Sequence, residues 1–241
     1  MVSSIVDLLC ALRGALVSGV GGSNGCATRR AGELVAVLAC CAGVSGDLQA
    51  QQTAPEPQGT RQSVHRLASV GQFLGGAAVG LGLHEGAHLL FDVIFDADPG
   101  IKRVEFHGIP FFAITHRPDL SPRQEFVIDS AGFWAQHATS ELLLTRRPRL
   151  RHEHAPFAKG LLAFNIGASG AYSIAAFAQT GPPERDTRGM AQAARIDEPW
   201  IGALILAPAV LDAWRYYEPD ARLPVWLSRA VKVAGVLLVF R

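Results

Sequence analysis

The chain has 241 residues, which is enough for one domain or two small ones. Apolar residues make up 49% of it and charged residues only 18%, so the apolar content is high for a soluble protein. The stretch from Gly160 to Ala178 has no charged residue and is long enough to cross a membrane, so we expect a membrane protein. The 22 basic and 21 acidic residues nearly cancel, so the chain lacks the basic excess expected of a protein that binds nucleic acid.

Residues 1–65 are predicted to form a signal-like or anchor-like segment followed by a polar linker. A basic pair at Arg29 and Arg30 precedes an apolar run from Leu34 to Gly43, and small residues follow that run, which is typical of a secretory signal or signal anchor. All four cysteines lie in the first 41 residues, and none forms a CxxC pair. They therefore give little support to a cysteine metal site or a disulfide framework.

An apolar run from Val70 to Phe95 contains the sequence His84-Glu85-Gly86-Ala87-His88. If the run is helical, the two histidines lie on one face, one turn apart, and both imidazoles can reach a single ion. Glu85 then stands beside that ion, where it can accept a proton from water activated by zinc. This is the H-E-x-x-H pattern of zinc metallopeptidases. The alternative is that these His and Glu side chains are simply hydrated, at a helix end on the membrane surface.

Residues 104–116 are rich in β-branched and aromatic side chains and predict two short strands around His107 and Gly108. Pro110 restricts its strand to an edge position. An exposed edge beside a hydrolytic site gives an extended peptide a place to pair. A surface hairpin at the membrane interface explains the same pattern equally well.

Further helices are predicted downstream. Residues 126–145 carry polar side chains that should face the interior of a helix bundle, namely Asp129, Gln136, His137 and Glu141. Residues 157–178 are the clearest membrane span, because no charge occurs from Gly160 to Ala178. The charged residues 181–188 are expected to be a solvated loop. Two more helices are predicted at 200–217, which contains Pro208 and Asp212, and at 225–240.

Taken in order, these motifs resemble the site-2 protease family of intramembrane zinc metallopeptidases. The resemblance covers roughly residues 70–217. It includes the H-E-x-x-H sequence, the strands at 104–116, the segment Ser130–Gln136, which resembles a glycine-proline segment, and Pro208–Asp212, which resembles a late proline and leucine-aspartate motif. The resemblance implies a zinc ion (Zn²⁺) bound by His84, His88 and Asp212, with Glu85 as the general base.

The position of Asp212 raises a geometric question. The histidine pair and Asp212 both lie toward the C-terminal ends of their predicted helices, so they share a depth most easily if those helices are parallel. Two intervening crossings, at 126–145 and 157–178, would make them antiparallel. We therefore expect residues 126–145 to be re-entrant or interfacial. Otherwise another residue supplies the third ligand, and Glu141 is the best substitute.

The sequence thus predicts a mainly α fold, a polytopic transmembrane helix bundle with a short β-hairpin after the metal-binding helix. Residues 66–241 are expected to form one membrane-embedded metallopeptidase-like domain. The expected protein is a zinc endopeptidase in a lipid bilayer, of the bacterial inner or plasma membrane type, that cleaves a membrane protein or peptide. The alternatives are a non-catalytic membrane scaffold that binds a partner, and a metal-dependent hydrolase of a lipid or small amide.

Overall fold

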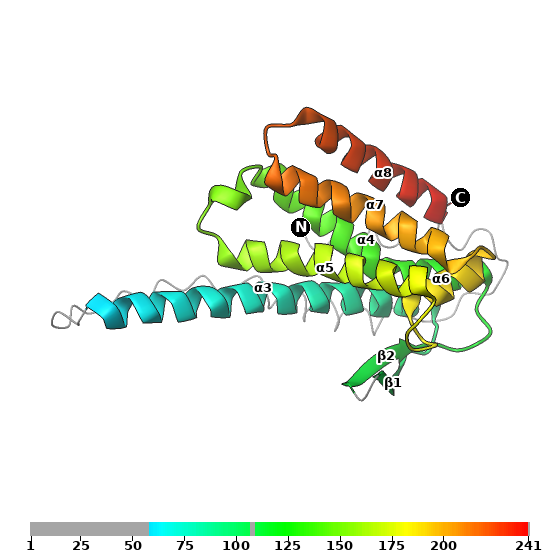
Figure 1. Ribbon diagram of the computed structural model, residues 1–241. Coiled ribbons are helices and arrows are strands. Elements are labelled where there is room, and N and C mark those ends of the chain that lie inside the picture. Colours follow the sequence, from blue (N-terminus) through cyan, green and yellow to red (C-terminus); the bar gives the residue numbers. More distant parts are fainter. Residues whose placement is uncertain (1–57, 107–108, 241) are drawn as a thin grey trace, which may run out of the picture. The chain divides into compact units, whose positions relative to one another are not determined.

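The computed structural model describes residues 58–106 and 109–240. Nearly all of the predicted signal-like segment and linker therefore lies outside the described residues. The described part is mainly helical and contains one two-stranded antiparallel sheet (Figure 1). The predicted mainly α class and the hairpin after the first helix are confirmed.

The elements follow one another in a simple order. They are α3 (Gln58–Phe95), β1 (Gly100–Phe106), β2 (Ile109–Thr115), α4 (Pro122–Arg146), the 3₁₀ turn η1 (Leu150–His152), α5 (Pro156–Ala178), α6 (Asp186–Ala194), α7 (Glu198–Tyr217) and α8 (Arg222–Phe240). Proline stands in the first turn of α4, α5 and α7, where its missing N–H is not needed. Ser121 also caps α4, because its hydroxyl accepts a hydrogen bond from the backbone N–H of Gln124.

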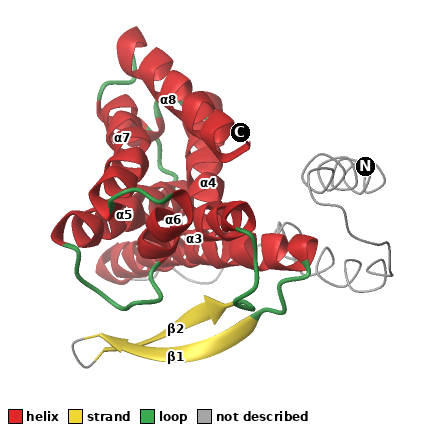
Figure 2. Cartoon of the chain, turned by 90° about the vertical axis from the view of Figure 1, so that its right-hand side faces the viewer, coloured by secondary structure: helices red, strands yellow, loops and turns green. Residues whose placement is uncertain are grey.

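The hairpin is longer than predicted. Its first strand begins at Gly100 rather than Val104, because Gly100 pairs with Thr115 at the open end of the ladder. Phe106 pairs with Ile109, which leaves a two-residue connection, as the sequence indicated. Figure 2 shows the hairpin leaving the helices as a separate two-stranded ribbon. In a two-stranded sheet both strands are edges, so Pro110 occupies the kind of strand that tolerates it.

Helices α3 and α5 pack side by side through glycines. A Cβ atom at Gly76 would overlap the carbonyl oxygen of Phe157, and one at Gly160 would overlap the backbone of Phe73. Gly80 faces the ring of Phe164 further along the same contact. Gly76 lies against Phe157, Gly80 against Phe164 and His84 against Tyr172, so α3 and α5 are parallel. The small residues predicted to permit close helix packing do so here.

Helix α4 runs antiparallel to α3, because Ile128 lies beside His88 while Gly132 lies beside His84. It is a continuous helix of 25 residues. A continuous helix does not fit the re-entrant alternative expected at 126–145, and the interfacial alternative stays a prediction. Helix α7 runs antiparallel to α5, because Gly202 near its start contacts Ser173 and Ala176 near the end of α5.

The contacts between α4, α5 and α7 include a row of buried polar side chains. Asn165 donates to the carbonyl of Gln136 and to Ser140, Ser169 donates to the Gln136 side chain, and Ser173 donates to a carbonyl of α7. Gln136 and His137 are almost fully buried, as predicted. Apolar packing is provided by side chains such as Phe133, Met190, Ile201 and Ile205.

Among the described residues, two helical stretches are long and apolar enough to cross a membrane, His65–Phe95 and Pro156–Ala178. They belong to α3 and α5, the pair joined by glycine contacts. The predicted span at 157–178 is one of them.

The close contact between α3 and α5 gives a stability prediction. Gly160→Ala should lower the free energy of unfolding by about 1–3 kcal/mol, because the added methyl group meets the backbone of α3. A matched control lies on the same helix at Gly167, where a Cβ atom would meet nothing within 4 Å. Gly167→Ala should leave stability unchanged or raise it by up to about 1 kcal/mol. Denaturant unfolding in detergent measures both, and equal effects would contradict the close contact.

Candidate metal centre

The two histidines of the H-E-x-x-H sequence lie on one face of α3, as their spacing predicts. His84 and His88 are 2% and 5% exposed, and their Nε2 atoms are 3.3 Å apart. The apolar surroundings leave these nitrogens few alternative partners. Two ring nitrogens directed at each other in such a place indicate a shared ligand or proton.

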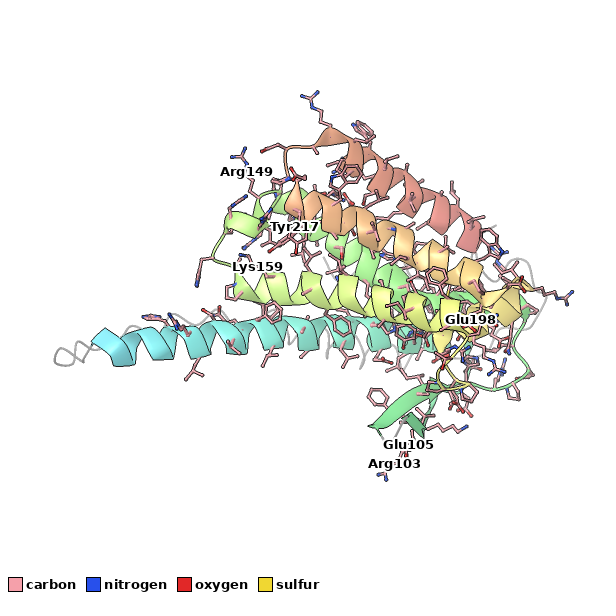
Figure 3. The ribbon with its side chains drawn as sticks, viewed as in Figure 1. Arg103, Glu105, Arg149, Lys159, Glu198 and Tyr217 are labelled. Carbon is pink, nitrogen blue, oxygen red and sulfur yellow. The ribbon has the colours of Figure 1, made fainter. Side chains whose placement is uncertain are left out.

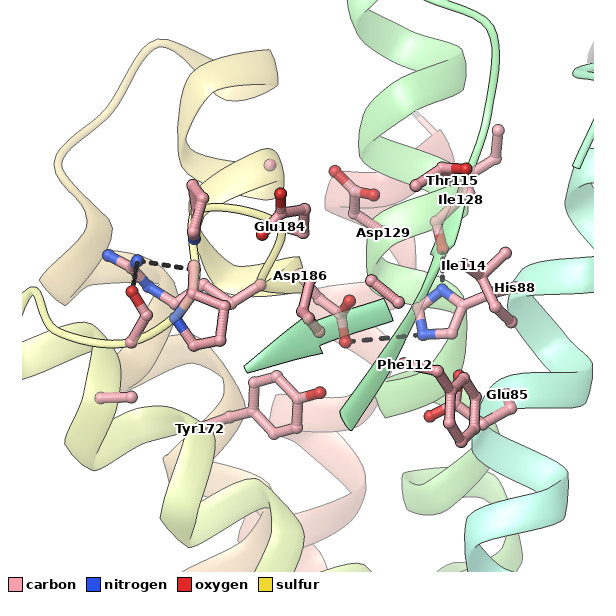
Figure 4. A pocket seen from close by; sticks show the side chains of 18 of the residues that line it. Glu85, His88, Phe112, Ile114, Thr115, Ile128, Asp129, Tyr172, Glu184 and Asp186 are labelled. Carbon is pink, nitrogen blue, oxygen red and sulfur yellow. Dashed lines mark hydrogen bonds and ion pairs between the residues drawn. The ribbon is translucent and has the colours of Figure 1, made fainter. Parts of the chain in front are cut away.

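The third member of the group is Asp186, the first residue of α6. Its Oδ2 atom lies 3.2 Å from Nε2 of His84 and 3.5 Å from Nε2 of His88 (Figure 4). The three side chains form a group that can hold a metal ion. Burial opposes the ionisation of Asp186, but the positive charge of His88 and the hydrogen bond to His84 hold the pKa of Asp186 below its ordinary value.

The spacing of the three donor atoms fits a small tetrahedral cation. With ligand distances of about 2.0–2.1 Å, tetrahedral geometry separates ligand atoms by roughly 3.3–3.4 Å. The three observed separations are 3.2, 3.3 and 3.5 Å. In addition, Nδ1 of His88 lies 2.7 Å from the carbonyl oxygen of Ile128. A carbonyl only accepts, so Nδ1 carries a proton. With a metal ion bound in place of a second proton, His88 would be neutral and would present the lone pair of Nε2.

The residues on both sides of Asp186 are anchored to the start of α7. Arg185 donates two hydrogen bonds to the carboxylate of Glu198, at 2.6 and 2.5 Å, and the hydroxyl of Thr187 donates a third at 2.7 Å. All three side chains are largely buried. These hydrogen bonds to Glu198 hold the backbone on both sides of Asp186 and direct the Asp186 carboxylate toward α3.

The backbone of α4 closes the group from a third side. A Cβ atom at Gly132 would lie 2.5 Å from Nδ1 of His84 and 2.6 Å from Nε2 of His88. Only glycine permits this approach. The segment Ser130–Gln136, which resembles a glycine-proline segment in the sequence, lies within α4 and contributes a small residue at the point where α4 meets the imidazoles.

A cavity of about 650 Å³ opens beside the group. Glu85, His88 and Asp186 line it on one side, and residues Phe112–Thr115 of β2 line it on another. Figure 4 shows Tyr172 of α5 with its hydroxyl directed toward Asp186. The cavity places a carboxylate, two of the three candidate ligands and a strand edge around one space.

The structure does not bring Asp212 to the histidines, and this corrects the predicted third ligand. Asp212 bonds instead to Lys232 at 2.8 Å, to Ser228 at 2.7 Å and to Arg215 at 3.4 Å. The reason is the direction of α7. Glu198, at its start, is the residue that anchors Asp186, and Asp212 lies fourteen residues further on, roughly 21 Å along the helix axis.

Glu141, the substitute considered for Asp212, belongs to the same distant group. It is ion-paired with Arg215, Arg229 and Lys232. We call Glu141, Asp212, Arg215 and Lys232 the ionic cluster. In Figure 3, Glu198 and Tyr217 mark the two ends of α7 and lie well apart, with Tyr217 near Arg149 and Lys159. The ionic cluster belongs to the Tyr217 half of the helix.

Asp186 lies in the segment 181–188, which the sequence predicts to be a solvated loop, so it was not among the predicted ligands. One local signal was present. Pro182 and Pro183 stop α5 from continuing, and an acid three residues later is a favourable first residue for a new helix. That signal predicts a helix start and says nothing about which residues in space it faces.

Comparisons with known proteins add no neighbour. No protein-family model matches the sequence, and no curated protein or solved structure matches it. The functional assignment therefore depends on the geometry of the site.

The glycine contact in α4 predicts a specific loss of metal affinity. Gly132→Ala should weaken metal binding by about 10–100-fold, because the methyl group displaces both imidazoles. Gly86→Ala is the matched control, since a Cβ atom there meets nothing within 4 Å although Gly86 lies between the histidines in the sequence. Titration of the metal-free variants with Zn²⁺ measures both affinities. Equal Zn²⁺ affinity in the two variants would contradict the close contact between Gly132 and the two imidazoles.

The identity of the third donor is tested by exchanging carboxylates for amides. Asp186→Asn should reduce the zinc content of the purified protein to well below one ion per chain, because an amide oxygen is a much weaker zinc ligand. Asp212→Asn should leave the zinc content unchanged. Elemental analysis after dialysis gives both values, and a loss of zinc confined to Asp212→Asn would restore the prediction from sequence.

Proposed function

We propose that this chain is an intramembrane zinc metalloprotease of the kind that its sequence resembles. The observation that carries the proposal is the group His84, His88 and Asp186 with Glu85 beside it on the wall of a cavity. Two imidazoles and one carboxylate are the ligand set of many catalytic zinc sites, which leave a fourth position open. A buried structural site would more often close that position with another protein ligand.

Bound by these residues, a zinc ion would supply a Lewis acid that lowers the pKa of water and polarises a carbonyl group. The chain's own part is to move the proton. Glu85 follows His84 in the sequence and lines the same cavity as His88 and Asp186. Its carboxylate accepts a proton from the attacking water and returns it to the leaving nitrogen, as the C–N bond breaks and the water oxygen joins the carbonyl carbon.

The strand beside the cavity favours a peptide as the substrate over a lipid or a small amide. Four consecutive residues of β2, Phe112–Thr115, line the cavity, whereas β1 contributes only Val104. The free edge of β2 is therefore the one nearer the candidate metal centre. An extended peptide can pair with such an edge through backbone hydrogen bonds, which would hold its carbonyl groups in register with the site.

The distribution of polar and apolar side chains supports a position in the membrane. In the most apolar window of each candidate span, only 28% and 33% of the residues are buried within the described structure. The core helix of a soluble protein would be mostly buried. Exposed apolar side chains also continue onto α7 and α8, including Trp200, Val210, Trp226 and Leu237, while the buried contacts hold serine, asparagine and glutamine. Lipid is the solvent that suits this arrangement.

The proposed role of Glu85 is tested by Glu85→Gln. The variant should keep one zinc ion per chain, because Glu85 is not a ligand, and should lose peptide hydrolysis by about 10²–10⁴-fold, because no base remains to take the proton. The double variant His84→Ala, His88→Ala should lose both zinc and hydrolysis. The measurements are zinc content and the release of products from a peptide library in detergent micelles. Full activity in Glu85→Gln would dismiss the enzymatic proposal.

A further inference from the structure

The cavity beside the candidate metal centre has an unbalanced charge. Apart from Glu85 and Asp186, three carboxylates line it, Glu125, Asp129 and Glu184. The charge of Glu184 is matched, since Nζ of Lys102 donates to it at 2.6 Å. The one arginine of the lining, Arg185, is committed to Glu198. Glu125 and Asp129 are left as acidic groups that no lysine or arginine of the lining pairs with.

These two residues share one face of α4, because they are four positions apart. The carboxylate of Asp129 lies directly over the backbone of α6 at Gly189, where a Cβ atom would overlap it. No hydrogen bond or ion pair joins Asp129 to another residue in the part of the chain that the structure describes, and Figure 4 shows its carboxylate directed into the cavity. A carboxylate in this position can bind a cationic group of a ligand that enters the cavity.

The pKa of Asp129 reflects this position beside other acids. Burial raises the pKa of Asp129 well above its ordinary value, and the negative charges of Asp186 and Glu125 add to the effect. A cationic group beside Asp129 would offset both causes and stabilise its ionised form. A dication bound by Asp186, with Glu85 beside it, would be balanced by those two carboxylates and would leave Asp129 and Glu125 to a second cation.

We infer that Asp129, together with Glu125, forms a subsite for a basic side chain, so that the chain selects peptides with lysine or arginine close to the scissile bond. Cleavage next to the basic residue rests on the proposed function. The subsite itself requires only the cavity and the free edge of β2. A basic residue beside an apolar segment is a feature of the ends of membrane spans. The substrate class is therefore a peptide that enters the cavity with a cationic juxtamembrane residue.

The test separates binding from cleavage. The probes are fluorescent ten-residue peptides of leucine and alanine with one lysine moved through each position, and the same peptides with norleucine in its place. Binding is measured by anisotropy to full-length Glu85→Gln protein in detergent, which does not consume the peptide. At one or two positions, the peptide with lysine should bind at least 10-fold more tightly than the peptide with norleucine at the same position.

Adding Asp129→Asn to that protein should reduce the preference to less than about 3-fold. The control is Glu105→Gln, which removes one negative charge from the exposed part of β1 (Figure 3) and should keep the preference. Equal binding of lysine and norleucine peptides at every position, or an unchanged preference in Asp129→Asn, would overturn the subsite. Cleavage of the same peptides by the unsubstituted protein is scored separately. Cleavage without a lysine preference defeats this inference alone, whereas lysine-selective binding without cleavage supports the subsite and defeats the proposed protease.

Discussion

The described structure depends on holding three electron-pair donors within about 3.5 Å of one another in a largely apolar interior. Two neutral imidazole nitrogens and a carboxylate repel each other unless a cation or a proton lies between them. Several features keep them together despite that cost. The carbonyl of Ile128 sets the tautomer of His88, Gly132 brings the backbone of α4 against both rings, and Glu198 clamps the two neighbours of Asp186. The first two act from α4 on the histidines of α3, and the third acts from α7 on Asp186 of α6.

The directions of the helices decide which acid can join the histidines. Because α3 and α5 are parallel, the loop that follows α5 emerges at the same end as the histidine pair, and α6 begins there with Asp186. Helix α7 starts at that end and runs away from it, so Asp212 is carried to the opposite half of the bundle. There it joins Glu141, Arg215 and Lys232, where the charges of α4, α7 and α8 compensate one another. A carboxylate in such a cluster is paired with its own cations and is not available to a distant ion.

Local sequence patterns predicted what local geometry determines. The spacing of His84 and His88 fixed their common face, the composition of residues 104–116 indicated a hairpin, and the polar residues Gln136 and His137 were correctly expected to be buried. The third donor depends on helix direction and on contacts between residues about a hundred positions apart, which periodicity does not encode. The number of predicted helix crossings did indicate that Asp212 fits poorly as the third ligand of the histidine pair. Of the two alternatives expected for 126–145, the re-entrant one does not fit, because that segment is a continuous helix antiparallel to α3, and the interfacial one stays a prediction.

We propose that His84, His88 and Asp186 together bind one catalytic zinc ion. Anomalous diffraction from crystals of the zinc-loaded protein, measured on both sides of the zinc absorption edge, locates that ion without reference to activity. The account predicts one strong peak within about 2.0–2.2 Å of both Nε2 atoms and of a carboxylate oxygen of Asp186, with one further position facing the cavity. A peak beside Asp212 and Glu141, or the absence of any peak between the two imidazoles, would contradict it.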